Sequence, residues 1–290
     1  MRLLLINLVL VFCGVIIQPI NAQETKSHLE KGMEAAVKDD YLTAHKEFMA
    51  GALLNDKYCC GRLAAMYYYG VGIKSDVIEA KKWATKGYEL GNSYSAAILG
   101  LLSCFGDNVD EQNYIKARPL LLFAYTADDA ELENEELYAN VGVLILLGYL
   151  FEDDDENAEL WIGRVLHDYP NFANGYGVAS LYYLDKEDYE KAVKYATIAD
   201  QSDNINGIYT LGYCMTYGRS MVKNIDNGIK RLRKAALLGQ VDAMEELGDI
   251  YSEGKLVPKD MQEAMKWYKK ASDAGSDDAE EKYDMLNNND

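Results

Sequence analysis

Histidine is the side chain most often used as a general base or metal ligand near neutral pH, and this chain has three in 290 residues. His28, His45 and His167 are far apart in the sequence, and none belongs to an HExxH pattern or lies beside another ligand at a metal-binding spacing. The chain also lacks a GxSxG turn and a phosphate-binding glycine loop. These absences predict a protein that is not an enzyme and that needs no metal and no cofactor.

Two other groups of residues have the chemistry for metal binding or covalent bonding. Asp153, Asp154 and Asp155 offer carboxylates, but the segment lacks the glycine and the terminal glutamate of a calcium loop, so a solvated loop is expected. Four cysteines lie beyond the N-terminal segment and form no CxxC pair: Cys59, Cys60, Cys104 and Cys214. A packed thiol at Cys59 and a disulfide from Cys59 or Cys60 to Cys104 both remain open interpretations.

The charge balance is strongly acidic. Lysine and arginine number 29 against 47 aspartates and glutamates, and the formal net charge is −18. Such a surface repels phosphate backbones and anionic headgroups, which argues against nucleic acid and against a membrane surface as partners. The acidity is explained either by the solubility that it confers or by attraction of a basic protein or peptide.

The N-terminal segment has the layout of a secretory signal peptide over residues 1–22. A single basic residue, Arg2, precedes an apolar run, and Pro19 comes before the small residue Ala22, after which cleavage is expected. The alternative is an uncleaved anchor, because residues 3–20 are nearly long enough to span a bilayer. Loss of Arg2 would leave a mature chain with a charge of −19. Since no Asn-x-Ser/Thr acceptor occurs, the sequence predicts a bacterial periplasmic or secreted protein.

Small residues recur along the rest of the chain at a period near 36 residues. In the stretch LGDIYSEGKLVPKDMQEAMKWYKKASDAG, residues 247–275, Leu247, Gly248, Gly254, Ala271 and Gly275 have identical residues 36 positions earlier. The stretch 63–91 has Leu63, Gly70, Ala80, Trp83 and Gly91 at the same offsets. A repeat of this length is typical of a solenoid. We therefore expect elements that stack side by side instead of one globular core.

Each repeat is predicted to be a helix–turn–helix. In the last one, Gly248 lies inside the first helix, where it costs about 1 kcal/mol relative to alanine, so we expect close approach of Ala264 on the second helix. Gly254 is expected to end the first helix in the left-handed conformation. Asp260 followed by Glu263 is typical of a helix N-cap with a capping box.

The small residue of each second helix marks the successive repeats along the chain. It falls at Ala44, Ala80, Ala117, Ala158, Ala192, Gly228 and Ala264. Residues 23–290 are thus predicted to form one solenoid of about seven repeats, followed by a capping helix at 277–287. The repeats lie near 26–55, 56–91, 92–128, 134–169, 172–201, 204–239 and 240–275.

The pattern Leu-Gly-x-x-Tyr-x-x-Gly, then Ala-x-x-Trp and a closing Ala-x-x-x-Gly, resembles the Sel-one-like repeat family, which is related to tetratricopeptide repeats. The last repeat carries it almost completely, and the second and sixth carry it clearly. The first and fifth repeats are closer to tetratricopeptide repeats, and the third and fourth diverge. The resemblance implies an all-α, right-handed α/α solenoid that serves as a scaffold for protein contacts.

The resemblance also implies that the first helix of each repeat lines the concave side. The family's concave-facing pattern, transferred to this sequence, selects eight aromatic residues and three acidic ones: Tyr58, Tyr68, Tyr69, Tyr94, Phe105, Tyr209, Tyr213, Tyr217, Glu245, Asp249 and Glu253. Tyrosine is common at recognition surfaces because it combines apolar area, a hydroxyl and little entropy loss. A protein or extended peptide with apolar anchors and lysine or arginine is therefore the expected partner.

These features predict an exported, non-catalytic scaffold for protein binding. An immunity protein that neutralises a toxin in the periplasm and a regulatory adaptor of the envelope fit them equally well. The alternative is a hydrolase of cell-wall or β-lactam compounds, because some cysteine-rich relatives have been associated with β-lactams. This chain lacks the regular cysteine pairs of those relatives.

Overall fold

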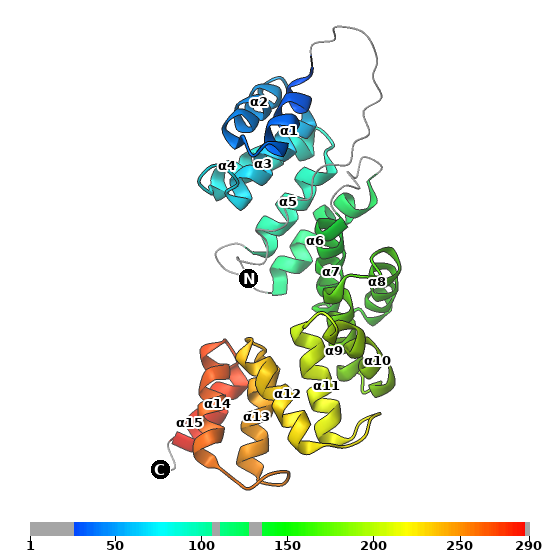
Figure 1. Cartoon of the computed structure of the whole chain (residues 1–290), viewed down its shortest axis with the longest axis vertical. Coiled ribbons are helices and arrows are strands. Elements are labelled where there is room, and N and C mark those ends of the chain that lie inside the picture. The colour runs from blue at the N-terminus through cyan, green and yellow to red at the C-terminus, as the bar shows by residue number, and fades with distance from the viewer. Residues whose placement is uncertain (1–25, 106–110, 128–134, 288–290) are drawn as a thin grey trace. The chain divides into compact units, whose positions relative to one another are not determined.

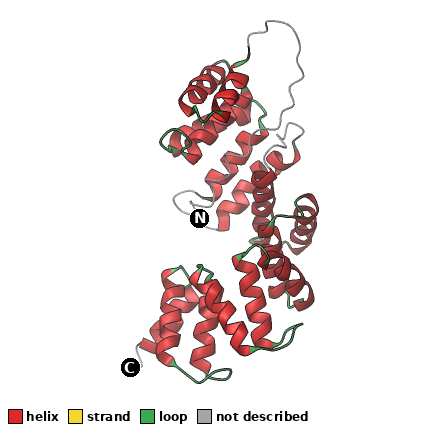
Figure 2. Cartoon of the chain, viewed as in Figure 1, coloured by secondary structure: helices red, strands yellow, loops and turns green. Residues whose placement is uncertain are grey.

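All regular elements that the structure describes are α-helices. The computed structural model describes residues 26–105, 111–127 and 135–287, and in these ranges it contains fifteen helices and no strand (Figures 1 and 2). The prediction of an all-α helical repeat solenoid is confirmed. No helix in the described ranges is long and apolar enough to cross a membrane. The predicted leader at 1–22 lies outside them.

The chain divides into two compact units, residues 1–170 and 171–290. Unit 1 contains α1 (His28–Val37), α2 (Tyr41–Leu53), α3 (Lys57–Tyr69), α4 (Val77–Glu89), α5 (Ser93–Cys104), α6 (Glu111–Thr126), α7 (Glu135–Leu150) and α8 (Asp155–Asp168). Unit 2 contains α9 (Ala173–Asp185), α10 (Tyr189–Asp200), α11 (Ile205–Tyr217), α12 (Ile225–Leu237), α13 (Val241–Glu253), α14 (Met261–Asp273) and α15 (Asp277–Asn287). Within each unit every helix packs against the next one along the chain.

Polar side chains at the turns determine where most helices begin. The cap of α14 is typical: the Asp260 carboxylate accepts the backbone N–H of Glu263 at 2.9 Å, as predicted. The other half of the predicted capping box is replaced, because the Glu263 carboxylate accepts the indole N–H of Trp267 at 3.0 Å. The same indole-to-glutamate bond joins Trp83 to Glu79 at 2.9 Å in α4.

The small residue of every second helix is buried. The six alanines that mark the second helices, from Ala44 to Ala264, have no exposed surface, and Gly228 is buried as well. A Cβ on Gly228 would lie 2.2 Å from the Thr216 hydroxyl and 2.9 Å from the Gly212 carbonyl oxygen, both on the paired helix. The 36-residue periodicity therefore reflects the sites at which two helices of a repeat approach each other most closely.

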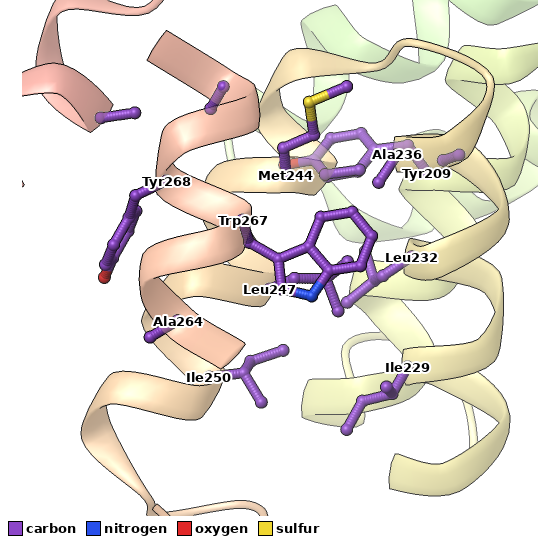
Figure 3. Packing of buried hydrophobic residues seen from close by; sticks show 14 of the residues in the cluster. Tyr209, Ile229, Leu232, Ala236, Met244, Leu247, Ile250, Ala264, Trp267 and Tyr268 are labelled. Atoms are coloured by element: carbon purple, nitrogen blue, oxygen red, sulfur yellow. The ribbon is translucent and has the colours of Figure 1, made fainter. Parts of the chain in front are cut away.

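The core of unit 2 is centred on Trp267. Figure 3 shows its indole projecting from α14 toward Leu247 of α13 and Leu232 of α12, and both leucines are fully buried. The residues of the cluster come from α11, α12, α13, α14 and α15. Trp83 and Trp161, at the same repeat position, are also buried. The Ala-x-x-Trp motif is therefore a packing element.

Gly248 makes a close approach, but to a different residue from the one predicted. A Cβ at this position would lie 2.4 Å from the Tyr268 ring, and Ala264 is not among its nearest neighbours. The predicted close approach of the second helix is therefore present, but Tyr268 makes the nearest contact, and the repeat pattern did not identify it because it ranks positions by size only. It does not show that a tyrosine ring four residues further along α14 reaches across the helix pair.

Gly248→Ala should therefore destabilise the protein although alanine is the better helix former. The Tyr268 ring is held by hydrogen bonds from its hydroxyl to Asp249 at 2.6 Å and with Ser252 at 3.0 Å. Overpacking costs about 1–3 kcal/mol, and the gain in helix propensity returns about 1 kcal/mol. We expect a net loss of about 1 kcal/mol in the free energy of unfolding, measured by urea denaturation.

Gly163→Ala is the matched control for this substitution. Gly163 is an exposed helical glycine of α8, and a Cβ there meets nothing within 4 Å. This variant should gain up to about 1 kcal/mol from propensity alone. Equal shifts in the two variants would contradict the close packing of Tyr268 on Gly248.

Candidate functional site

The three histidines do not come together. The His28 Nδ1 atom lies 2.7 Å from a carboxylate oxygen of Glu47, and the His45 Nε2 atom lies 3.0 Å from the Tyr67 hydroxyl. His45 is half-buried, and burial lowers its pKa. His167 pairs with its exposed neighbour Asp168 at 2.9 Å. Each histidine thus has a nearby partner of its own.

Asp154 of the acidic loop has a structural role, and the four cysteines are packed in the interior. Asp154 caps α8 by accepting the backbone N–H of Asn157 at 3.2 Å. Across the described ranges, no three potential metal ligands gather in one place. The thiols of Cys59, Cys60, Cys104 and Cys214 are all free and buried. Burial raises the pKa of Cys59 and of Cys104 to about 12, so the packed-thiol interpretation describes the structure.

In unit 1 the predicted aromatic residues are divided between different places. Tyr68 and Tyr69 make an edge-to-face contact at 4.8 Å, and Tyr94, which is buried, lies close enough to influence the Tyr69 hydroxyl. That hydroxyl is enclosed and has no hydrogen-bond partner among the described residues. Tyr58 is half-buried at the beginning of α3, and Phe105 packs edge-on against Tyr114 of α6, with ring centroids 6.4 Å apart.

In unit 2 the predicted tyrosines form a continuous row along one side of α11. The ring centroids of Tyr209 and Tyr213 lie 6.4 Å apart, and those of Tyr213 and Tyr217 lie 4.8 Å apart. Tyr209 is only 8% exposed and belongs mainly to the core, whereas Tyr213 and Tyr217 are half-buried and therefore remain partly exposed to solvent. The four-residue spacing places all three on one helix face.

Helix α13 brings a row of carboxylates to this row of tyrosines. The Tyr217 hydroxyl donates a hydrogen bond to Glu246, a residue that the sequence analysis missed. Glu245 is half-buried beside it, and Glu253 is exposed at the end of the helix. We call the surface formed by Tyr213, Tyr217, Glu245, Glu246 and Glu253 the tyrosine–carboxylate face.

Asp249, predicted as part of the same surface, is partly exposed and is bonded to two other helices. Its carboxylate accepts hydrogen bonds from the Tyr268 hydroxyl at 2.6 Å and from the Lys282 ammonium group at 2.8 and 3.0 Å. These bonds connect α13 to α14 and to the last helix. Asp249 therefore stabilises the end of unit 2.

The environment of the tyrosine–carboxylate face raises the pKa of two of its members, Glu246 and Tyr217. Burial is the main cause that raises the pKa of the Glu246 carboxyl, and neighbouring Asp249 and Glu253 raise it further. Burial and the bond to Glu246 raise the pKa of Tyr217. Both shifts reflect negative charge that is held close together and partly removed from water.

Comparison with known proteins places this repeat architecture in a family. The family model for the Sel1 repeat matches residues 57–92, 93–129, 174–199, 206–240 and 241–276, which is more than half of the chain. The chain belongs to the Sel1 repeat family. The resemblance inferred from the Leu-Gly-x-x-Tyr-x-x-Gly pattern is confirmed. The matches include the third repeat and also the fifth, which the sequence pattern placed closer to tetratricopeptide repeats.

Solved Sel1 repeat proteins share the fold. A Sel1 repeat protein from Oxalobacter formigenes is 27% identical, with 85% of this chain and 99% of that chain covered and a TM-score of 0.56. A protective antigen of uropathogenic Escherichia coli with the SLR fold is 19% identical, with 90% and 64% covered and a TM-score of 0.55. A search of the curated proteins finds no match. Sel1 repeat proteins generally mediate protein–protein interactions, which indicates protein partners for this chain.

Proposed function

We propose that this Sel1 repeat protein is an exported, non-catalytic scaffold. It binds a protein or an extended peptide on the face formed by the first helix of each repeat. One observation carries the proposal: Tyr213 and Tyr217 form a partly exposed aromatic pair beside a row of carboxylates on the next first helix. Rigid aromatic side chains with a polar tip are enriched among the residues that dominate interface energies. The family architecture assigns this face to the inner side of the solenoid.

Export is supported by the sequence of the N-terminus alone. Arg2, the apolar run and the small residue Ala22 favour a leader that directs the chain to the periplasm or the medium and is removed after Ala22. Buried, unreactive thiols are compatible with that location. Edman sequencing of the secreted or periplasmic protein would locate the mature N-terminus.

Loss of the partly exposed Tyr213 and Tyr217 should strongly weaken partner capture. The partner is first identified by pull-down from an envelope extract followed by mass spectrometry, and its affinity is then measured by calorimetry. Because each anchor contributes on the order of 1 kcal/mol, Tyr213→Ala with Tyr217→Ala should weaken binding about 30-fold. Tyr68→Ala with Tyr69→Ala tests the corresponding residues of unit 1.

Tyr88→Ala is the control for this experiment. Tyr88 lies on α4, a second helix, and packs edge-on against Phe123 at 5.4 Å. Its removal should leave the affinity unchanged, and far-UV circular dichroism should show full helical content in all variants. Undiminished capture by the Tyr213/Tyr217 variant would refute the proposed surface.

Two narrower roles use the same surface. An immunity protein would neutralise one toxin, and its gene would be expected next to a toxin-like reading frame. An envelope adaptor would instead bind a resident protein and would have no such neighbour. Protection of susceptible cells by the expressed protein, lost in the Tyr213/Tyr217 variant, would select the first role.

A further inference from the structure

The two helices that form the tyrosine–carboxylate face differ completely in charge. Helix α11 has no charged side chain, whereas α13 carries Asp242, Glu245, Glu246, Asp249 and Glu253 and no cationic residue. The hydrogen bond from Tyr217 to Glu246 shows that the two rows meet. A ligand that crosses from one helix to the other therefore passes from an aromatic surface to an anionic one.

Among the described residues, neither Glu245 nor Glu246 forms an ion pair with a cationic side chain of the protein. The groups that act on Glu246 are Tyr217, Asp249, Glu253 and Lys282, and the Lys282 ammonium group is already bonded to both oxygens of Asp249. Glu253 has a cationic neighbour in the exposed Lys255 at 3.2 Å, a contact in solvent that is weak. A cation supplied from outside would offset the repulsion of Glu246 by Asp249 and Glu253.

The tyrosine row suits the other half of such a ligand. The rings of Tyr213 and Tyr217, 4.8 Å apart, offer apolar area to an aromatic or branched side chain. Helices α11 and α13 meet through the Tyr217–Glu246 side-chain hydrogen bond and not through close packing of their backbones, and an extended chain advances about 3.3 Å per residue. A chain that crosses from α11 to α13 therefore needs several residues to move a side chain from the tyrosines to the carboxylates.

We propose that the tyrosine–carboxylate face binds an extended cationic segment in which a lysine or arginine lies several residues from an aromatic or branched apolar side chain. The apolar side chain packs on Tyr213 and Tyr217, and the cation pairs with Glu246 and Glu253. This assignment rests on the proposed function and specifies the sequence that the partner presents.

A spacing series of synthetic peptides tests the assignment. Fluorescein-labelled ten-residue peptides carry one phenylalanine and one lysine separated by one to six positions in a Gly/Ser background, and a parallel set has glutamine in place of lysine. Fluorescence anisotropy with the mature chain at low ionic strength and at 0.15 M salt gives the affinities. We expect one spacing to bind most tightly, a weaker affinity at the higher salt and at least tenfold weaker binding of the glutamine peptides.

Glu246→Gln identifies the carboxylate that pairs with the cation. Glutamine keeps an acceptor for the Tyr217 hydroxyl and removes the charge, so the melting temperature should be retained or raised while the lysine peptides bind about tenfold more weakly. Binding of the glutamine peptides should not change. Glu253→Gln, at an exposed position, gives a second measurement of peptide affinity that does not depend on the stability of the core. Glu190→Gln on α10 is a matched control for the loss of one charge.

The outcomes separate this inference from the proposed function. Affinity independent of the spacing, equal binding of lysine and glutamine peptides, or absence of binding by the whole series would overturn the cationic assignment. A partner captured through Tyr213 and Tyr217 by a neutral or acidic segment would leave the proposed function standing and this inference refuted. Capture that survives loss of both tyrosines would refute the function itself.

Discussion

Trp267→Ala should lower the free energy of unfolding of unit 2 by about 3–5 kcal/mol, the range for removing a buried tryptophan. The side chain is 4% exposed, and its indole packs against Leu247 and Leu232 from two other helices (Figure 3). Its N–H also donates to Glu263 at 3.0 Å, so the substitution leaves that carboxylate with one donor fewer. Three helices would lose contacts through one residue.

Urea denaturation followed by far-UV circular dichroism measures the effect of Trp267→Ala. Trp267→Phe should recover more than half of the loss, because the phenyl ring fills most of the space without the N–H donor. Leu237→Ala is the control for a large apolar residue outside the core: Leu237 is 73% exposed, and its loss should change stability by less than about 0.5 kcal/mol. A loss below about 1 kcal/mol for Trp267→Ala would contradict the central position of the indole.

Gly72→Ala should cost about 3 kcal/mol, the second largest effect that the structure predicts. Gly72 has φ +68°, where a side chain costs about 1–2 kcal/mol, and a Cβ would lie 2.0 Å from the Tyr41 Cβ and 3.3 Å from its Cα. Since the second contact is with backbone, the overlap cannot be relieved by rotating a side chain, and it adds about 1–3 kcal/mol. The loop of the second repeat packs directly on the first helical residue of α2.

Gly91→Ala isolates the packing part of this cost. Gly91 has φ +79°, but a Cβ there meets nothing within 4 Å, so only the backbone penalty of about 1–2 kcal/mol should remain. Differential scanning calorimetry of the two variants gives the comparison. Equal melting temperatures would show that the contact between the Gly72 loop and Tyr41 contributes nothing to stability.

The fold could be predicted from the sequence because the repeat makes the buried packing positions recognisable. Ala44, Ala80 and the corresponding small residues recur at a helical-repeat period, and in the structure they are the buried contact positions of the helix pairs. Caps such as Asp260 and the left-handed Gly254, at φ 69°, are local features, so their chemistry is visible in a few neighbouring residues. Periodicity and local caps were sufficient for an all-α repeat solenoid.

The candidate site was only partly predictable, because its members are selected by contacts between helices. The pattern identified Tyr213 and Tyr217, yet it did not distinguish them from Tyr209, whose ring is covered by the next repeat. Asp249 was predicted as part of the binding surface, but the structure bonds it to Lys282, 33 residues away on α15. Glu246 was missed although Asp242, Glu246, Asp249 and Glu253 follow a helical spacing, which was the available signal.

The succession of helices, each packed mainly on its immediate chain neighbours, has an evolutionary consequence. In such an array, energetic coupling decays over one or two repeats, so the cost of a changed surface is confined to the helix that carries it. The carboxylates of α13 can be exchanged for other side chains while α3 and its neighbours in unit 1 keep their stability. Binding specificity is thus free to diversify module by module on a scaffold whose architecture stays constant.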